Sequence, residues 1–156
     1  MPAEVKESHH FNEFEKDYKI TLPENWQVQR GFMGLDVFAA APFENKEVGS
    51  RANISVISTE GDQELTLDQY FNLNIENLKS KLSDFKQIES GKAMLSGTEA
   101  RKLVYSHQMN GLDIKVIQYF ILKGKKGYVI TCAASADVFP KYADTFERSV
   151  RTFQLL

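Results

Sequence analysis

The side chains that could do chemistry in this sequence are few and lie far apart. His9 and His10 are adjacent in a polar stretch, and two histidines alone lack the third and fourth ligands of a structural metal site. His107 precedes a turn, and no serine or cysteine stands at a spacing that would pair with it, so we expect no general base there. Cys132 lies in an apolar run, where a free cysteine usually packs as a small hydrophobic residue.

Motifs that mark enzymes and nucleotide sites are missing from the sequence. There is no G-x-S-x-G, H-E-x-x-H, P-loop, G-x-G-x-x-G or C-x-x-C pattern. We therefore expect no enzymatic activity, no cofactor and no metal site. The 21 acidic residues are scattered, but a hydrolase with paired carboxylates stays open, because such pairs form only in three dimensions.

Two apolar residues between glycines are the most unusual local feature. Phe32 and Met33 stand between Gly31 and Gly34, in a segment that reads as a loop between strands. Two interpretations stay open. The pair either caps the hydrophobic core or forms an exposed contact with a partner or a lipid surface.

The sequence has one cluster of basic residues, at Lys123, Lys125 and Lys126. Together with Gly124 and Gly127 it predicts a tight, solvated hairpin turn. The alternative interpretation is a small contact with an anionic partner. Both Phe32–Met33 and these lysines are therefore candidate partner contacts.

Size and charge limit the possible function classes. A chain of 156 residues is the usual size of one domain, and its net charge of −2 gives no electrostatic footprint for nucleic acid. A single cysteine rules out an internal disulfide bond. No stretch approaches the roughly 20 apolar residues of a transmembrane helix.

The first 17 residues are mostly polar and predict a flexible leader, followed by one domain over residues 18–156. The leader lacks the basic and then apolar pattern of a signal peptide. It is either a natural cytoplasmic N-terminus or a mature region whose signal or lipid anchor has been removed. The second option would place the protein in the periplasm or on a membrane tether.

The elements that would position these side chains are several short strands followed by a helix. Alternating apolar residues predict strands over residues 18–22, 26–30, 35–41 and 51–58. Thr66 and Gln69 have the spacing of a capping box. The apolar stripe that follows them predicts an amphipathic helix from Thr66 to about Leu82.

The second half predicts long antiparallel strands closed by a helix. Strands are expected over residues 85–94, 99–107, 112–122 and 127–135, and Asn110-Gly111 is a strong hairpin signal. The last helix carries an apolar stripe of Phe139, Tyr142, Phe146, Val150 and Phe153, and its exposed face offers the pairs Asp144–Arg148 and Glu147–Arg151 four residues apart. The fold class is α+β, an antiparallel sheet with packed helices.

From Tyr18 to the end, the chain resembles the PsbP-like superfamily, the Mog/PsbP-like α/β/α sandwich, and is most similar to its bacterial DcrB-like envelope branch. The resemblance rests on Tyr18-x-Ile-x-Leu-Pro-x-x-Trp26, the helix from Thr66, Gly97-x-x-Ala-x-x-Leu-x-Tyr105, Gly127-Tyr-Val-Ile-Thr-Cys-Ala133 and Ser149-Val-Arg-Thr-Phe153.

The resemblance implies a mostly non-catalytic accessory or binding role with an unknown protein partner, in the bacterial cell envelope. Two alternatives stay open: a small-molecule-binding or hydrolytic protein with a cleft between sheet and helix, and a cytoplasmic GTPase regulator. The family offers no residue-level functional motif that can be carried onto this sequence.

Overall fold

A seven-stranded antiparallel sheet forms the centre of the molecule, in the order β3-β4-β5-β9-β8-β7-β6. The computed structural model describes residues 12–42 and 51–156. The strands of this sheet are β3 (Gln27–Arg30), β4 (Val37–Ala40), β5 (Asn53–Glu60), β6 (Ser83–Leu95), β7 (Thr98–Met109), β8 (Leu112–Lys123) and β9 (Lys126–Ser135).

A smaller antiparallel sheet joins the two ends of the described chain. It consists of β1 (Asn12–Glu15), β2 (Tyr18–Leu22) and β10 (Gln154–Leu155), with β2 in the middle. The predicted flexible leader over residues 1–17 is therefore wrong for residues 12–17. The sequence pattern does not predict β1, because only Phe14 among its four residues is buried and a single inward residue shows no alternation. Residues 1–11, including His9 and His10, lie outside the described residues.

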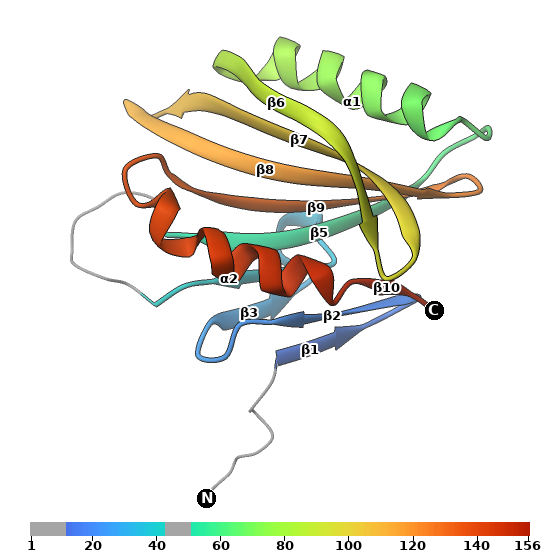
Figure 1. Ribbon diagram of the computed structural model, residues 1–156, viewed down its shortest axis with the longest axis horizontal. Coiled ribbons are helices and arrows are strands. Elements are labelled where there is room, and N and C mark those ends of the chain that lie inside the picture. Colours follow the sequence, from blue (N-terminus) through green and yellow to red (C-terminus); the bar gives the residue numbers. More distant parts are fainter. Residues whose placement is uncertain (1–11, 43–50) are drawn as a thin grey trace, which may run out of the picture.

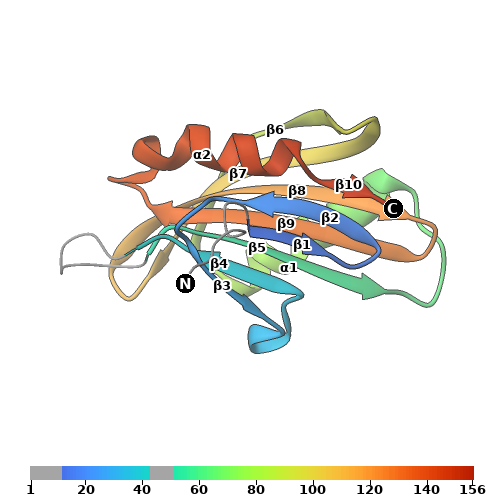
Figure 2. The same ribbon diagram turned by 90° about the horizontal axis from the view of Figure 1, so that it is seen from below.

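Two helices cover opposite faces of the large sheet, as Figure 1 shows. Helix α1 (Leu67–Lys81) packs on β6, β7 and β8. Helix α2 (Phe139–Arg151) packs on β9 and on β2, so it shares its face of the large sheet with the small sheet (Figure 2). This arrangement confirms the predicted α+β class of Mog/PsbP-like type.

Each side of the large sheet has its own hydrophobic core. The larger core lies between the large sheet, the small sheet and α2, and its fully buried side chains include Tyr18, Phe146 and Phe153. The smaller core lies beneath α1 and includes Phe71 and Phe120. Alternate residues of β8 and β9 enter the two cores in turn, as expected for strands covered on both faces.

Local signals in the sequence set the ends of α1 and the hairpin turns. The Thr66 hydroxyl accepts a hydrogen bond from the Gln69 amide, and the Gln69 side chain accepts one from the Thr66 amide, so the predicted capping box is confirmed. Asn110 and Gly111 have φ values of 53° and 81°, as a type I′ turn requires.

The strand β6 forms one edge of the large sheet and is mostly exposed. Its pairing with β7 is shifted twice, between Ser83 and Lys86 and between Gln87 and Glu89.

Within the described ranges, no helix is long and apolar enough to cross a membrane.

Candidate functional site

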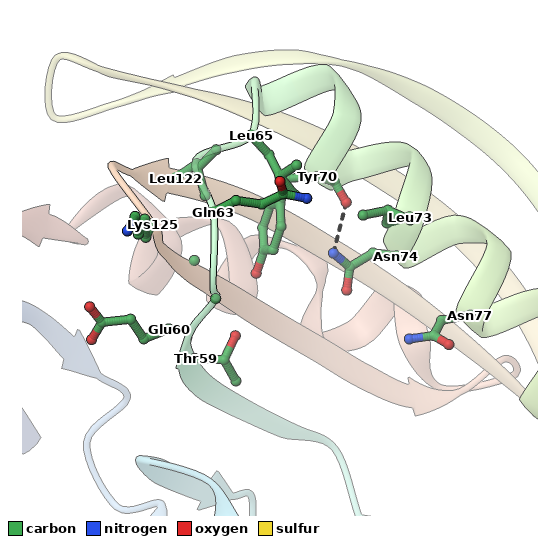
Figure 3. Close-up of a pocket in the computed structure, with 12 residues that line it drawn as sticks. Thr59, Glu60, Gln63, Leu65, Tyr70, Leu73, Asn74, Asn77, Leu122 and Lys125 are labelled. Atoms are coloured by element: carbon green, nitrogen blue, oxygen red, sulfur yellow. Dashed lines mark hydrogen bonds between the residues drawn. The ribbon is translucent and has the colours of Figure 1, made fainter.

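A shallow hollow beside the first turns of α1 lies between that helix and the ends of β5 and β9 (Figure 3). We call it the α1 groove. Its volume is about 230 Å³, below the range of roughly 300–1,000 Å³ that is usual for ligand pockets. Its walls carry Thr59, Glu60, Gly61, Gln63, Leu65, Tyr70, Leu73, Asn74, Asn77, Leu122, Lys125 and Gly127.

Tyr70 forms the inner wall of the α1 groove. Its ring lies directly on Gly127, where an added Cβ would come within 2.7 Å of Cε1 and still closer to the phenol oxygen. Burial raises the pKa of Tyr70, and hydrogen bonds with the Thr59 and Asn74 side chains oppose this only in part. The phenol stays neutral, so the groove walls offer amide and hydroxyl groups rather than an activated nucleophile.

A larger groove lies on the other side of the sheet, between the β2–β3 loop and the outer face of α2. We call it the α2 groove. Its volume is about 740 Å³, and it is lined by Thr21, Leu22, Pro23, Glu24, Asn25, Trp26, Thr145, Arg148, Ser149, Arg151 and Thr152.

The loop wall of the α2 groove is held in place from behind. The half-buried Trp26 indole makes edge-on contacts with Tyr142 and Phe146, at centroid distances of 6.0 and 6.2 Å. The Asn12 amide donates hydrogen bonds to the carbonyl oxygens of Pro23 at 2.6 Å and Trp26 at 3.3 Å. The groove is thus built from a fixed loop and a rigid helix.

The helix wall of the α2 groove carries an unpaired guanidinium group. The predicted pair Glu147–Arg151 is confirmed at 2.9 Å, but the predicted pair Asp144–Arg148 is wrong: among the described residues Arg148 makes no ion pair. Helical spacing allowed the contact, but Arg148 lies along the groove instead. The exposed Arg148 therefore remains available to a partner.

Phe32 and Met33 form part of a one-turn 3₁₀ helix, η1 (Phe32–Gly34), between β3 and β4. The exposed fractions of Phe32 and Met33 are 38% and 82%, and Phe32 contacts the Phe38 ring at 5.1 Å between centroids. Because η1 has no buried residue, Phe32 and Met33 belong to neither hydrophobic core, and their role as an exposed contact stays a prediction. The structure places both side chains at the surface.

The three candidate lysines at the β8–β9 turn have different surroundings. Lys123 is exposed, and Lys125 lines the α1 groove. Lys126 pairs with Asp17, with Nζ 2.5 Å from Oδ2, and its ammonium group lies 5.7 Å from the centre of the Tyr128 ring. Lys126 therefore joins the hairpin to the small sheet.

A polar cluster at this end of the larger core was not predicted from the sequence. The Asp17 carboxylate accepts hydrogen bonds from Lys126 and from the Tyr128 hydroxyl at 2.9 Å. Burial opposes its ionisation, but these hydrogen bonds outweigh that cost and lower the Asp17 pKa. Tyr128 is buried, and its pKa is raised by burial and by Asp17.

A second carboxylate completes the polar cluster. Asp36 accepts hydrogen bonds from the hydroxyls of Tyr18 at 2.9 Å and Ser58 at 2.8 Å, and Lys16 lies 3.6 Å away. Burial and Asp36 raise the pKa of Tyr18. Both tyrosines therefore act as neutral donors that join the small sheet to the large one.

Residues that could have been catalytic do not gather into one site. Cys132 is fully buried, and burial raises the pKa of its thiol, which makes it unreactive at neutral pH. His107 lies beside the Tyr105 ring on β7, on the opposite face of the sheet from Cys132. Within residues 12–42 and 51–156, no group of three His, Cys, Asp or Glu side chains could hold a metal ion.

A family model described as DcrB matches residues 18–152. This chain belongs to the DcrB family. The match begins at the tyrosine with which the predicted resemblance began, and it covers both helices and all strands of the large sheet. A comparison with curated protein sequences finds no match.

Solved structures similar to this DcrB-family chain share its fold at low sequence identity. LpqN of Mycobacterium tuberculosis, described as involved in cell envelope biogenesis, has a TM-score of 0.68 and 17% identity, over 88% of this chain and 83% of that one. Cyanobacterial PsbP from Synechocystis has a TM-score of 0.66 and 15% sequence identity, over 94% of this chain and 92% of that one. The Ran-binding protein Mog1p of Saccharomyces cerevisiae has a TM-score of 0.64 and 10% sequence identity, over 93% of this chain and 95% of that one. The predicted PsbP-like fold is thus confirmed.

The α2 groove of this DcrB-family fold is not predicted from the sequence, although one signal for it is present. The Pro-x-x-Trp26 spacing predicts only a family feature, but tryptophan is also one of the residue types enriched at the energetic centres of protein interfaces. The role of Arg148 could not be predicted from the sequence, because only the folded helix shows which arginine has no carboxylate as an ion-pair partner.

Proposed function

We propose that this protein is a non-catalytic binding module of the bacterial cell envelope that docks on a protein partner through Phe32 and Met33. The single observation that carries the proposal is the exposure of these two apolar side chains on η1. DcrB family membership supports the accessory role, and the description of LpqN as involved in cell envelope biogenesis supports the location.

The backbone of η1 is unusual in a way that favours a functional role. Gly31, Met33 and Gly34 have φ values of 68°, 52° and 82°. A non-glycine residue in the left-handed region costs about 1–3 kcal/mol and persists where the surroundings fix it. Met33 accepts this conformation while its side chain stays in water, so burial does not offset the cost.

The neighbouring side chains fit a protein contact. Phe32 rests on Phe38 and is thus oriented rather than loose. An aromatic residue beside a methionine is a common combination at protein interfaces, because both bury large apolar areas and methionine adapts its shape. We do not include Lys126 in this contact, because its ammonium group is paired with the Asp17 carboxylate.

The double substitution Phe32→Ser and Met33→Ser tests the contact. Because Met33 is 82% exposed and Phe32 packs on the half-buried Phe38 ring outside both cores, we expect the melting temperature to fall by no more than about 4 °C. We expect capture of the native partner from envelope extracts to fall about tenfold or more. Phe85→Ser, at a partly buried position that packs against the core under α1, is the matched control and should lower stability without removing partner contacts.

Two results would overturn this proposal. A large loss of thermal stability in the Phe32/Met33 variant would make the pair structural. Equal recovery of partners by the variant and the wild type would exclude the contact. Fractionation of cells that express the natural gene tests the location separately: we expect the protein with the envelope, and its recovery with cytosolic proteins would contradict that part.

A further inference from the structure

The α2 groove has the dimensions of a binding site and plays no part in the proposed contact at η1. Its volume of about 740 Å³ lies within the range usual for ligand sites. The groove includes the loop that precedes β3, whereas η1 follows the last residue of β3, so the two surfaces lie at opposite ends of this strand. The two surfaces can therefore be altered independently.

The groove carries hydrogen-bond donors that the fold leaves unused. Arg148 has no ion-pair partner in the described part of the chain, and it lines the groove. Because Arg148 is exposed, its guanidinium N–H groups are free to donate to a ligand acceptor.

Charge in the groove favours a negatively charged ligand. Arg148 contributes one unpaired positive charge, and Arg151 adds a second that is shared with Glu147 at 2.9 Å. Among the described residues, Glu24 is the one carboxylate that lines the groove. A guanidinium group binds a carboxylate through two parallel hydrogen bonds, which gives both strength and orientation.

The loop wall adds an apolar anchor beside the charge. The Trp26 indole is half-buried and held edge-on by Tyr142 and Phe146, and Pro23 stands next to it in the wall. Tryptophan and arginine are the residue types that most often dominate the binding energy of protein interfaces. Because the loop is fixed by Asn12, little ordering cost would accompany binding.

We propose that the α2 groove docks an acidic peptide segment of a protein partner, in which a carboxylate pairs with Arg148 and an apolar side chain packs on Trp26. The inference goes beyond the proposed function, because it assigns a second surface and states the chemistry of the segment that it binds.

Selection from a library of random 12-residue peptides displayed on phage tests the proposal. The target is the full chain, with an Arg148→Glu variant for comparison. We expect the wild type to enrich peptides rich in Asp and Glu that also hold an aromatic or aliphatic residue. Arg148→Glu should weaken the binding of these peptides about tenfold or more, because it replaces an ion pair by a repulsion. Arg148→Ala serves in its place if the charge reversal prevents folding.

The single tryptophan of the chain reports on the groove directly. On addition of a selected peptide, we expect the Trp26 indole N–H resonance to shift in the wild type. Lys92→Glu, which makes the same charge change at an exposed position on β6, should bind the peptide as the wild type does. The Phe32→Ser/Met33→Ser variant should also bind normally, so failure at η1 and failure at the groove can be distinguished.

Three outcomes would overturn the assignment. The first is that no peptide, or only basic or uncharged peptides, is enriched. The second is that Arg148→Glu and Arg148→Ala bind acidic peptides as tightly as the wild type. The third is a Trp26 resonance that does not move while the peptide binds, which would place the peptide elsewhere.

Discussion

The Asp17 carboxylate shows how a single side chain can connect two sheets. It accepts hydrogen bonds from Lys126 and Tyr128 on β9, while its own main-chain carbonyl accepts one from the Leu156 amide at 3.0 Å. These bonds tie the β1–β2 turn to the first residues of β9. The lowered Asp17 pKa follows from this position.

We predict that Asp17→Asn makes the protein less stable at pH 7 and less sensitive to acid. Because the folded-state pKa of Asp17 lies below its ordinary value of 3.8, the ionised group contributes its full stability above that pH. The contribution is lost as the pH falls through the lowered pKa. The difference in free energy of unfolding between wild type and variant should therefore narrow below about pH 4.

Urea denaturation between pH 7 and pH 3 measures this difference. Asp144→Asn is the control, because Asp144 is exposed on α2 and forms no ion pair within the described residues. A gap between wild type and Asp17→Asn that stays constant over the whole pH range would contradict the prediction.

At the scale of elements, α1 is fixed to the sheet by an aromatic ring that lies on a glycine. The Tyr70 ring occupies the space that any side chain at Gly127 would need. Phe71 and Ile75, the two buried residues of α1, lie on the same core under the helix. The helix is therefore held at its first turns by shape as well as by apolar area.

We predict that Gly127→Ala lowers the free energy of unfolding by about 1–3 kcal/mol, as overpacking does in other cores. In the Tyr70→Ala background, the same substitution should cost much less, because the ring is gone. Chemical denaturation of the two single variants and the double variant gives the coupling between the positions.

Gly91→Ala provides the matched control on β6. A Cβ at Gly91 would meet no atom within 4 Å, so we expect little change in stability. Equal effects of Gly127→Ala and Gly91→Ala, or strictly additive effects of Gly127→Ala and Tyr70→Ala, would show that the ring does not fix α1.

Elements with strong local signals were predictable from the sequence, and elements without them were not. Thr66 with Gln69 and Asn110 with Gly111 determine their own local conformations through short-range hydrogen bonds and positive φ angles. The strand β1 has only Phe14 as an inward residue, and the two-residue β10 exists because β2 lies beside it. Such strands depend on contacts that the sequence pattern does not contain.

At the scale of the whole molecule, Phe153 links three parts of the structure. It follows α2 directly, is fully buried, and packs against the rings of Tyr18 on β2 and Tyr128 on β9, at centroid distances of 5.1 and 6.0 Å. The helix, the small sheet and the large sheet therefore share one aromatic centre.

We predict that Phe153→Ala lowers the free energy of unfolding by about 3–5 kcal/mol, the usual cost of deleting a buried phenylalanine. This is a large part of the roughly 5–15 kcal/mol that stabilises a typical domain. Urea denaturation provides the measurement, with Phe32→Ala as the surface control. Similar losses for the two variants would contradict the assignment of Phe153 to the centre of the core.

A candidate surface residue was predictable only where the residues next to it in the sequence, such as flanking glycines, indicate a turn. Phe32 and Met33 stood out because glycines flank them, and the structure shows them exposed. The α2 groove needed the folded molecule, because it joins Trp26 to Arg148 across more than a hundred residues. The polar cluster of Asp17 and Asp36 likewise brings together turns that are distant in the chain.

The two register shifts of β6 have a consequence for how molecules of this protein meet one another. A long, exposed strand at the edge of a sheet is a template on which other chains can add strands and aggregate. The shifts near Lys86 and Glu89 interrupt the even row of main-chain groups that such addition requires. The charges of Lys86, Glu89 and Lys92 on the same strand further oppose it, so the distorted edge of β6 disfavours the addition of a strand from another copy of the protein.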